Sequence, residues 1–488
     1  MKEWVLILII LIPVLGGISI PVLPIKNRRI KHIYIEGLVL INSILVACLI
    51  IDPPVGRFEI VNFVQKLSLS LKMDGMSAVF GGLVAVLWPL ATLYAFAYMK
   101  EEKRQDAFYM FYTVTYGITL GIAFAEDLLT MYFFYELLTL TTVPLVLHSM
   151  TREAVLASRK YLYYSLGGAA FAFIGLIFVI SYGTTANFQL GGVLDMDKVA
   201  PKADVLLLVY VIAFLGFGVK AAICPFNSWL PQAGVAPTPV TALLHAVAVV
   251  KAGAFAIIRI THYSFGADFL KGTWAQSLVM AVVILTIFYG SSRAVKETHM
   301  KRRLAYSTIA NLSYILLGVV MMTPQGMLGA LTHMISHGIM KIEAFFCAGA
   351  IIHQSKKSYV YELDGLGQKM PVVFAALTIS ALGLMGVPMT AGFISKWNLA
   401  RAAVESKNPM ALAGLAILLI SAFLTAIYML PMVVRGYFPT EDSPQAMLEG
   451  VKDPGWQMVL PLVIIAVFIV GAGLFSTKLT EFLLALYQ

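Results

Sequence analysis

The sequence predicts an all-α polytopic membrane protein, and three observations support that prediction. Hydrophobic residues make up 59% of the 488 residues and charged residues only 12%, about half the charged share of soluble domains. Apolar stretches recur along the whole chain, each long enough to cross a hydrocarbon layer of about 30 Å as a helix. These stretches are continuous rather than alternating, which favours helices over the strands of a barrel.

About fourteen transmembrane helices are expected, one for each apolar stretch. The first is not interpreted as a signal peptide, because no A-x-A-like cleavage site follows it and further stretches come after it. The expected helices occupy residues 4–23, 32–51, 75–98, 108–125, 127–149, 160–182, 205–224, 239–262, 274–292, 304–322, 328–352, 371–389 with a broken continuation to 400, 410–434 and 456–486.

The loops differ in charge, and this difference orients the helices. Loops that follow odd-numbered helices (the odd-numbered loops) contain about twice as many Lys and Arg residues as the even-numbered loops and the two termini together. Because Lys and Arg accumulate in cytoplasmic loops, we expect the odd-numbered loops in the cytoplasm and both termini outside. The net charge of +9 is explained by this topology and does not indicate nucleic-acid binding.

Five basic residues lie within the expected helices: Lys220, Lys251, Arg259, Lys341 and Lys396. A basic side chain at the centre of a membrane helix costs about 2.5–3.5 kcal/mol on insertion scales, and such residues mark ion or proton pathways. Arg259 lies close to the end of its helix, so we expect its side chain to reach water there. The lysines are flanked by apolar residues on both sides and are candidates for proton transfer.

Lysine suits proton transfer better than arginine, which stays protonated. In general, burial lowers the pKa of a lysine and a nearby carboxylate raises it, so a moving partner charge can load and release a proton. Glu136 is the matching carboxylate, in DLLTMYFFYELLTLTTVPLVL. The alternative for Glu136 is a hydrogen bond between helices that only fixes their packing.

His333, His337 and Lys341 are spaced at i, i+4 and i+8, so they share one helical face. Three titratable groups in a row suit a proton relay. A metal site is the competing interpretation, but the sequence lacks an H-E-x-x-H glutamate and the lysine would repel a cation. His245, six residues before Lys251, extends the same set or forms a hydrogen bond in the core.

Two of the expected helices are interrupted. Four prolines lie in PFNSWLPQAGVAPTPV, shortly after Lys220, and Gly386, Pro388 and Gly392 precede Lys396 in ALGLMGVPMTAGFISKW. Broken helices at membrane depth are tolerated where they line a hydrated cavity, and one such segment per half of the chain indicates inverted repeats. We therefore expect three N-terminal helices in 1–107, two inverted five-helix repeats in 108–262 and 263–436, and a C-terminal helix in 437–488.

No cofactor chemistry is evident in the sequence. Cys48, Cys224 and Cys347 lie far apart and form no C-x-x-C pair, so iron–sulfur, haem and zinc ligation have no support. No nucleotide-binding motif is present either. We expect no bound cofactor or metal in this chain, and whether it belongs to an enzyme complex stays open.

The segment GVKAAICPFNSWLPQAGVAPTPVTALLHAVAVVKAGAFAIIR resembles the signature of the antiporter-like subunits shared by respiratory complex I, Mrp-type multisubunit cation/proton antiporters and membrane-bound energy-converting hydrogenases. LAYSTIANLSY, HMISHGIMK and GVPMTAGFISKW are similar to further stretches of that family, in the same order. The resemblance covers about residues 75 to 435. It implies a proton-translocating subunit, with other membrane subunits, lipid and, in a redox complex, a soluble arm as partners.

The resemblance also implies roles for single residues. Glu136 and Lys220 would form an ion pair that opens and closes, Lys251 would be the central relay lysine, and Lys396 would exchange protons with the outer side. His337 and Lys341 would continue the relay between them. Glu343, two residues after Lys341, departs from the family pattern.

Several expectations narrow the subtype. The chain stops at Gln488 without a long lateral helix, and it has a lysine at position 396, where one complex I subunit has a glutamate. Both points favour an Mrp D-like subunit or its counterpart in a hydrogenase-like complex, in a prokaryotic plasma membrane. The alternative is a self-contained secondary transporter for Na+/H+ exchange or an organic solute, which would need more buried carboxylates than the chain has.

Overall fold

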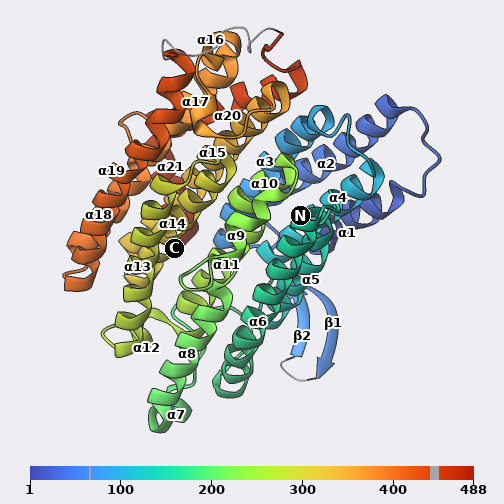
Figure 1. The fold of residues 1–488 in the computed structure, drawn as a ribbon. Coiled ribbons are helices and arrows are strands. Elements are labelled where there is room, and N and C mark those ends of the chain that lie inside the picture. The colour runs from blue at the N-terminus through green and yellow to red at the C-terminus, as the bar shows by residue number, and fades with distance from the viewer. Residues whose placement is uncertain (65–66, 440–449, 488) are drawn as a thin grey trace.

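The computed structural model describes residues 1–64, 67–439 and 450–487, and these residues are almost entirely helical (Figure 1). Eleven helical segments of the described chain are long and apolar enough to cross a membrane: α2 (Arg28–Ile51), α3 (Gly75–Tyr98), α5 (Leu128–Val146), α6 (Arg152–Tyr182), Met196–Gly218, Thr238–Phe265, α13 (Trp274–Lys296), α14 (Met300–Val320), α15 (Pro324–Ser355), α19 (Pro409–Tyr437) and α20 (Trp456–Leu474). The protein is therefore a multi-pass membrane protein.

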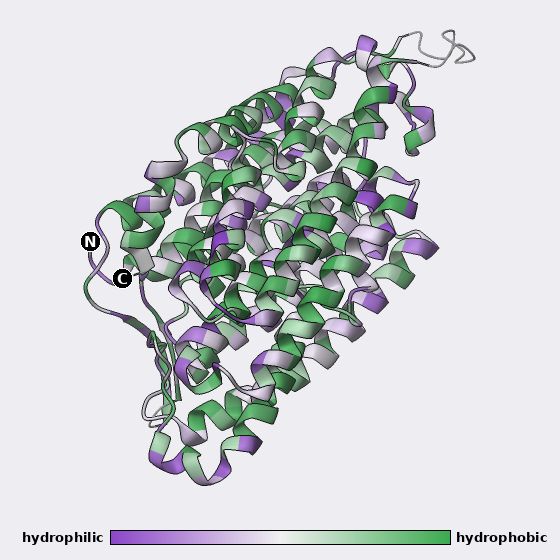
Figure 2. Ribbon diagram, turned by 90° about the vertical axis from the view of Figure 1, so that its left-hand side faces the viewer, coloured by the Kyte–Doolittle hydropathy of each residue, from purple (hydrophilic) through white to green (hydrophobic). Residues whose placement is uncertain are grey.

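The remaining expected ranges also contain helices. They are the shorter α1 (Val5–Ser19) and α17 (Pro371–Met385), and the 19-residue α4 (Gln105–Ala123). Hydropathic colouring shows hydrophobic residues along the helices and hydrophilic residues concentrated at the two ends of the bundle (Figure 2). The number fourteen for the crossing helices stays a prediction, because length and hydropathy support eleven of the described ones.

The expectation of an all-α chain is wrong in one detail. Strands β1 (Phe58–Val64) and β2 (Leu67–Leu71) form an antiparallel hairpin between α2 and α3, with Phe58 opposite Leu71. The LSLSL segment of β2 alternates apolar and polar residues, the pattern of a strand with one buried face. The hairpin projects from the lower end of the bundle in Figure 1.

Both predicted helix interruptions are present. The helix before Lys220, α8 (Ala203–Gly218), ends two residues before it, and the chain continues irregularly to the short α9 (Trp229–Gln232) and η2 (Ala233–Val235). Helix α17 ends at Met385, and α18 (Ala391–Glu405) begins after a five-residue break. Gly386 has φ +87°, a left-handed conformation that glycine adopts without strain and that ends many helices.

The sequence predicts two interrupted helices, but the structure contains a third. The third interruption divides the expected helix 239–262 into α10 (Thr238–Ala246) and α11 (Val249–Ile258), followed by the π-helical turn η3 (Arg259–Phe265). Val247 and Ala248 form this break, and neither is a residue that signals one. The expected last helix is likewise two helices, α20 and α21 (Ser476–Tyr487).

Helix α15 runs through the middle of the bundle and is buried over most of its 32 residues. It packs against α3, α10, α14, α17, α18 and α20 (Figure 1). The other elements are short connections: α7 (Met196–Val199), η1 (Ala200–Lys202), α12 (Ala267–Leu270), η4 (Val360–Glu362) and α16 (Leu366–Lys369). Because α15 contains His333, His337 and Lys341, the fold places these residues at its centre.

Candidate functional site: a buried line of titratable residues

The eight candidate residues lie on six segments around α15, and we call them the buried line. Six of them have no exposed surface and Lys396 is 8% exposed, whereas Glu136 is partly exposed on the surface of the chain. The members of the buried line are Glu136 on α5, Lys220 in the turn after α8, His245 on α10, Lys251 on α11, His333, His337 and Lys341 on α15, and Lys396 on α18.

Lys220 and Glu136 are neighbours but do not form the expected ion pair. Lys220 Nζ donates a hydrogen bond to the backbone oxygen of Tyr135 and lies 3.4 Å from the centre of the Tyr135 ring. No ion pair links Lys220 to Glu136 in the described part of the chain. Glu136 Oε1 is buried and has no hydrogen-bond partner among the described residues.

Lys251 and His337 are in direct contact. Lys251 Nζ lies 2.7 Å from His337 Nδ1, and neither residue is exposed. Lys251 is the third residue of α11, where the positive end of the helix dipole adds repulsion to the desolvation of an ammonium group. One of the two nitrogens donates and the other accepts, so one shared proton fits between them.

The break before α11 brings Lys251 close to Lys220. A Cβ atom at Gly253 would lie 2.9 Å from the carbonyl carbon of Lys220 and 2.5 Å from the nitrogen of Ala221. Gly253 therefore lets the first turns of α11 pack directly on the chain that carries Lys220. Lys220 and Lys251 are thus carried by touching segments.

His333 continues the buried line towards α18. Its ring stacks on that of His337 with 6.0 Å between centroids, and His333 Nδ1 lies 2.9 Å from Ser395 Oγ. Ser395 precedes Lys396 in α18. The hydroxyl of Ser395 is a polar contact that the sequence analysis did not include, since a serine in an apolar segment gives no distinctive signal.

Lys341 is held by hydroxyl groups rather than by a carboxylate. Its Nζ donates to Ser307 Oγ at 2.7 Å, and Ser307 Oγ lies 2.7 Å from the Tyr428 hydroxyl. The Tyr428 hydroxyl in turn donates to Thr425 Oγ1 at 3.0 Å. Hydroxyl groups both donate and accept, so this chain from α15 to α19 can pass or stabilise a proton.

Lys396 occupies the broken helix as expected. Its Nζ donates to the backbone oxygens of Leu384 and Met385, at 2.7 and 2.9 Å. These are carbonyls of the last turn of α17, which have no partner within their own helix. The break thus creates the binding site of the Lys396 ammonium group.

His245 and Glu343 are buried without polar partners in the described chain. Both ring nitrogens of His245 lack hydrogen bonds, and its ring packs on Phe345 at 4.7 Å. Both carboxyl oxygens of Glu343 lack them as well. Neither observation joins His245 to Lys251, so its place in the relay stays a prediction.

Arg259 does not reach water, contrary to expectation. It is 1% exposed and forms a bidentate pair with Asp74, with Nη1 2.6 Å and Nη2 2.9 Å from the carboxylate oxygens. The rings of Phe188, Phe255 and Tyr263 surround the guanidinium group at 4.8–5.0 Å. Asp74 lies outside the apolar stretches, which is why its pairing with Arg259 was missed.

The described part of the chain contains no group of three His, Cys, Asp or Glu residues that could hold a metal ion. The histidines of the buried line contact lysine, serine and one another. These partners suit proton transfer better than cation binding.

Comparisons with known proteins identify the family of this chain. Residues 125–425 match the family model of the NADH:quinone oxidoreductase/Mrp antiporter transmembrane region. NADH-quinone oxidoreductase subunit N of Desulforudis audaxviator is 28% identical, covering 87% of this chain and 85% of that protein. Na(+)/H(+) antiporter subunit A1 of Staphylococcus haemolyticus is 27% identical, covering 85% of this chain and 53% of that protein.

Two solved structures share the fold. A chain of the Mrp complex from Dietzia sp. superposes with a TM-score of 0.85 and 22% identity, covering 99% of this chain and 96% of that chain. A chain of the membrane-bound sulfane sulfur reductase, an archaeal respiratory membrane complex, superposes with a TM-score of 0.84 and 22% identity, covering 99% of this chain and 97% of that chain. The family model covers more than half of this chain and includes the whole buried line. The chain is therefore a member of the NADH:quinone oxidoreductase/Mrp antiporter family of multi-pass membrane subunits.

Proposed function

We propose that this chain translocates protons along the buried line as the antiporter-like subunit of a multisubunit ion-pumping complex. The contact between Lys251 and His337 carries the proposal. Two titratable nitrogens share a proton there without exposure to water, at a cost that a purely structural role would not require. The relatives are named as subunits of oxidoreductases and antiporters, which favours a complex over a self-contained transporter.

The proposed route begins at Glu136 and Lys220. Movement of the Glu136 carboxylate towards Lys220 would hold a proton there, and its withdrawal would release the proton towards Lys251. The proton then passes to His337 and on to Lys341 or, past His333, to Lys396. Lys396 sits among the freed carbonyls of α17 and exchanges with the outer side.

The same proposal includes the membrane arrangement. Fourteen helices cross a prokaryotic plasma membrane, with both termini outside and inverted repeats over 108–262 and 263–436. Na+ is the candidate counter-ion if the complex is an antiporter. An Mrp D-like subunit and the corresponding subunit of a redox-driven complex are equally compatible with the buried line, because both use the same proton path.

The proposal is tested with inside-out membrane vesicles containing the complex with its native partners. Lys251→Met should reduce proton accumulation at least tenfold, because methionine has similar length and no titratable group. Lys202→Met, at an exposed lysine bonded to Tyr182, is the matched control and should pump normally. Normal pumping by Lys251→Met in an intact complex would refute the proposed route.

The driving reaction is identified by purifying the tagged complex in mild detergent. Mass spectrometry of the partners and metal analysis separate the cases. Nickel and iron together with soluble subunits would indicate a hydrogenase-like pump. Iron without nickel would indicate another redox complex. Small membrane partners without any metal would indicate an antiporter. A chain that purifies alone and transports in liposomes would contradict the multisubunit assignment.

A further inference from the structure

Two recesses lie along α3, and we call the path that joins them the groove. Helices α2 and α20 both pack against α3 and form the walls of the groove. Where α2 and α20 begin and α3 ends, the groove widens into a recess of about 700 Å³. Its lining includes Arg28, Arg29, Glu36, Phe96, Lys100 and Trp456.

The recess has a strong positive charge without a partner. Arg28, Arg29 and Lys100 are exposed, and none of them forms an ion pair with any residue of 1–64, 67–439 or 450–487. Both arginines lie in the first turn of the 24-residue α2, where the helix dipole favours a negative group and repels a positive one. An anion bound there would offset the repulsion among the three basic side chains. It would also offset the repulsion between the two arginines and the positive end of the α2 dipole.

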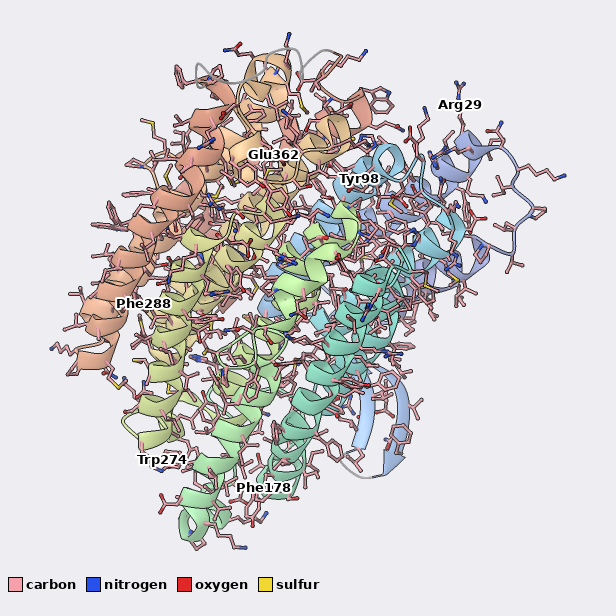
Figure 3. The ribbon with its side chains drawn as sticks, viewed as in Figure 1. Arg29, Tyr98, Phe178, Trp274, Phe288 and Glu362 are labelled. Atoms are coloured by element: carbon pink, nitrogen blue, oxygen red, sulfur yellow. The ribbon has the colours of Figure 1, made fainter. Side chains whose placement is uncertain are left out.

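The position of the recess fits a membrane surface. Arg29 points away from the bundle at the end where Tyr98 also lies (Figure 3), the end of the positively charged odd-numbered loops. Trp456 is 66% exposed at the start of α20, and tryptophan is enriched at the level of lipid headgroups. The charged mouth of the groove therefore lies where headgroups are found.

Below its mouth the groove is apolar. A second recess of about 480 Å³ lies between α2, α3 and α20 and is also bordered by Ile335 and Ile339 of α15 and Phe482 of α21. Its lining is apolar and includes Val86 and Val467. Along α3, Val86 lies about 18 Å below Tyr98, the last residue of the helix, which is more than half the thickness of a hydrocarbon layer of about 30 Å. An acyl chain that starts at the upper recess can lie on α3 down to the lower one.

Glu36 supplies a polar group between the two regions. It lies about 12 Å along α2 from Arg28, and its Oε2 is buried without a hydrogen-bond partner in the described chain. In its protonated form this carboxyl group can donate to an ester oxygen, which a phospholipid carries between its headgroup and its chains. Basic, polar and apolar groups thus follow one another in the order found in a phospholipid.

We propose that this groove is a binding site for an anionic phospholipid. The phosphate lies between Arg28, Arg29 and Lys100, and the acyl chains lie on α3 between α2 and α20. Basic pockets between transmembrane helices on the cytoplasmic side recognise such headgroups. The charged mouth contains no residue of the buried line, and the test measures bound lipid rather than proton transport.

The test measures lipid retained by the purified complex after washing in mixed micelles of phosphatidylcholine and phosphatidylglycerol, nine to one by design. Lipid is quantified per chain by mass spectrometry. The parent complex should retain phosphatidylglycerol selectively. The amount of phosphatidylglycerol retained per chain should fall at least fivefold in the triple variant Arg28→Gln/Arg29→Gln/Lys100→Gln. The matched control removes three lysines of another odd-numbered loop, in the triple variant Lys356→Gln/Lys357→Gln/Lys369→Gln. This control should retain phosphatidylglycerol fully.

A photo-crosslinking experiment tests the occupant directly, without weakening the site. Benzoylphenylalanine replaces Trp456, and the complex is irradiated in its own membrane. An adduct with the mass of an anionic phospholipid supports the proposal. An adduct with a neighbouring protein subunit, equal retention of both lipids by the parent, or full retention by the recess variant would overturn it.

Discussion

The contact between Lys251 and His337 limits the protonation states that the two residues can occupy together. At 2.7 Å a neutral histidine accepts from lysine, or a neutral lysine accepts from histidine, but two protonated nitrogens repel each other. A second proton that arrives at Lys251 must therefore break the contact or drive the first proton onwards. This property distinguishes a relay from a pair of buried groups that only pack together.

Replacing His337 with glutamine separates hydrogen bonding from proton transfer. Glutamine can accept from Lys251 but cannot carry a proton, so His337→Gln should reduce proton accumulation in vesicles at least tenfold while the complex assembles normally. Partner content after purification is the control for assembly. Unchanged pumping would mean that protons bypass His337.

The pair of Asp74 and Arg259 is expected to matter for stability. Removing one partner of a fully buried ion pair costs about 3–5 kcal/mol, and the 34% exposure of the Asp74 side chain reduces this cost through solvent screening. Asp74→Asn should still lower the apparent Tm of the detergent-solubilised protein, because Arg259 is buried. The double variant Asp74→Leu/Arg259→Leu should recover part of the loss, because it leaves no unpaired buried charge. A Tm of Asp74→Asn equal to that of the parent would show that Arg259 needs no counter-charge.

The same pair predicts a pH dependence. Burial alone would raise the pKa of Asp74, but the charge and hydrogen bonds of Arg259 outweigh it and hold that pKa below its usual value. The stabilisation is thus complete above the unfolded pKa of about 3.9 and is lost as the pH falls through the lower folded value. The Tm difference between the parent and Asp74→Asn should be constant from pH 7 to 5 and shrink below about pH 4; a difference that grows on acidification would contradict the assignment.

Among the elements, the break between α17 and α18 offers the sharpest test. A Cβ at Gly386 would require a strained backbone at φ +87° and would lie 2.9 Å from Lys396 Cδ. Gly386→Ala should therefore displace Lys396 and reduce proton accumulation at least fivefold. Gly272→Ala is the matched control, since Gly272 also has a positive φ of +78° but open space around it; equal effects of the two substitutions would assign the loss to backbone strain alone.

The sequence predicts the elements better than their details. Apolar stretches locate the helices because burial in lipid demands continuous runs, and prolines and glycines locate the breaks before α9 and α18. The break formed by Val247 and Ala248 contains no proline or glycine, so local sequence preference does not indicate it. The hairpin of β1 and β2 was missed because two short strands are a weak signal beside apolar helices.

The candidate site was predictable only for its charged members. A buried lysine is conspicuous in an apolar segment, but Ser307, Ser395 and Tyr428 are common residues whose contacts depend on how distant helices pack. Asp74 is a further example, because its partner Arg259 lies 185 positions away. Partners of this kind follow from the tertiary structure, which local patterns do not contain.

For the whole molecule, the charge asymmetry between its ends predicts the orientation. In a variant with all three cysteines replaced by serine, Lys271→Cys should react with an impermeant maleimide added to intact cells. Lys369→Cys, in an odd-numbered loop, should react only after the membrane is permeabilised. The reverse pattern would place both termini in the cytoplasm.

Helix α15 is a continuous rod of 32 residues, whereas Lys220, Lys251 and Lys396 are mounted on short segments next to chain breaks. His333, His337 and Lys341 therefore belong to one unbroken helix, and the other members of the buried line approach it from separate segments. On the proposed route, a proton moves between α15 and these segments only while they keep their contact with it. A disulfide engineered between α11 and α15 should consequently change the rate of proton transport without changing the order of the helices.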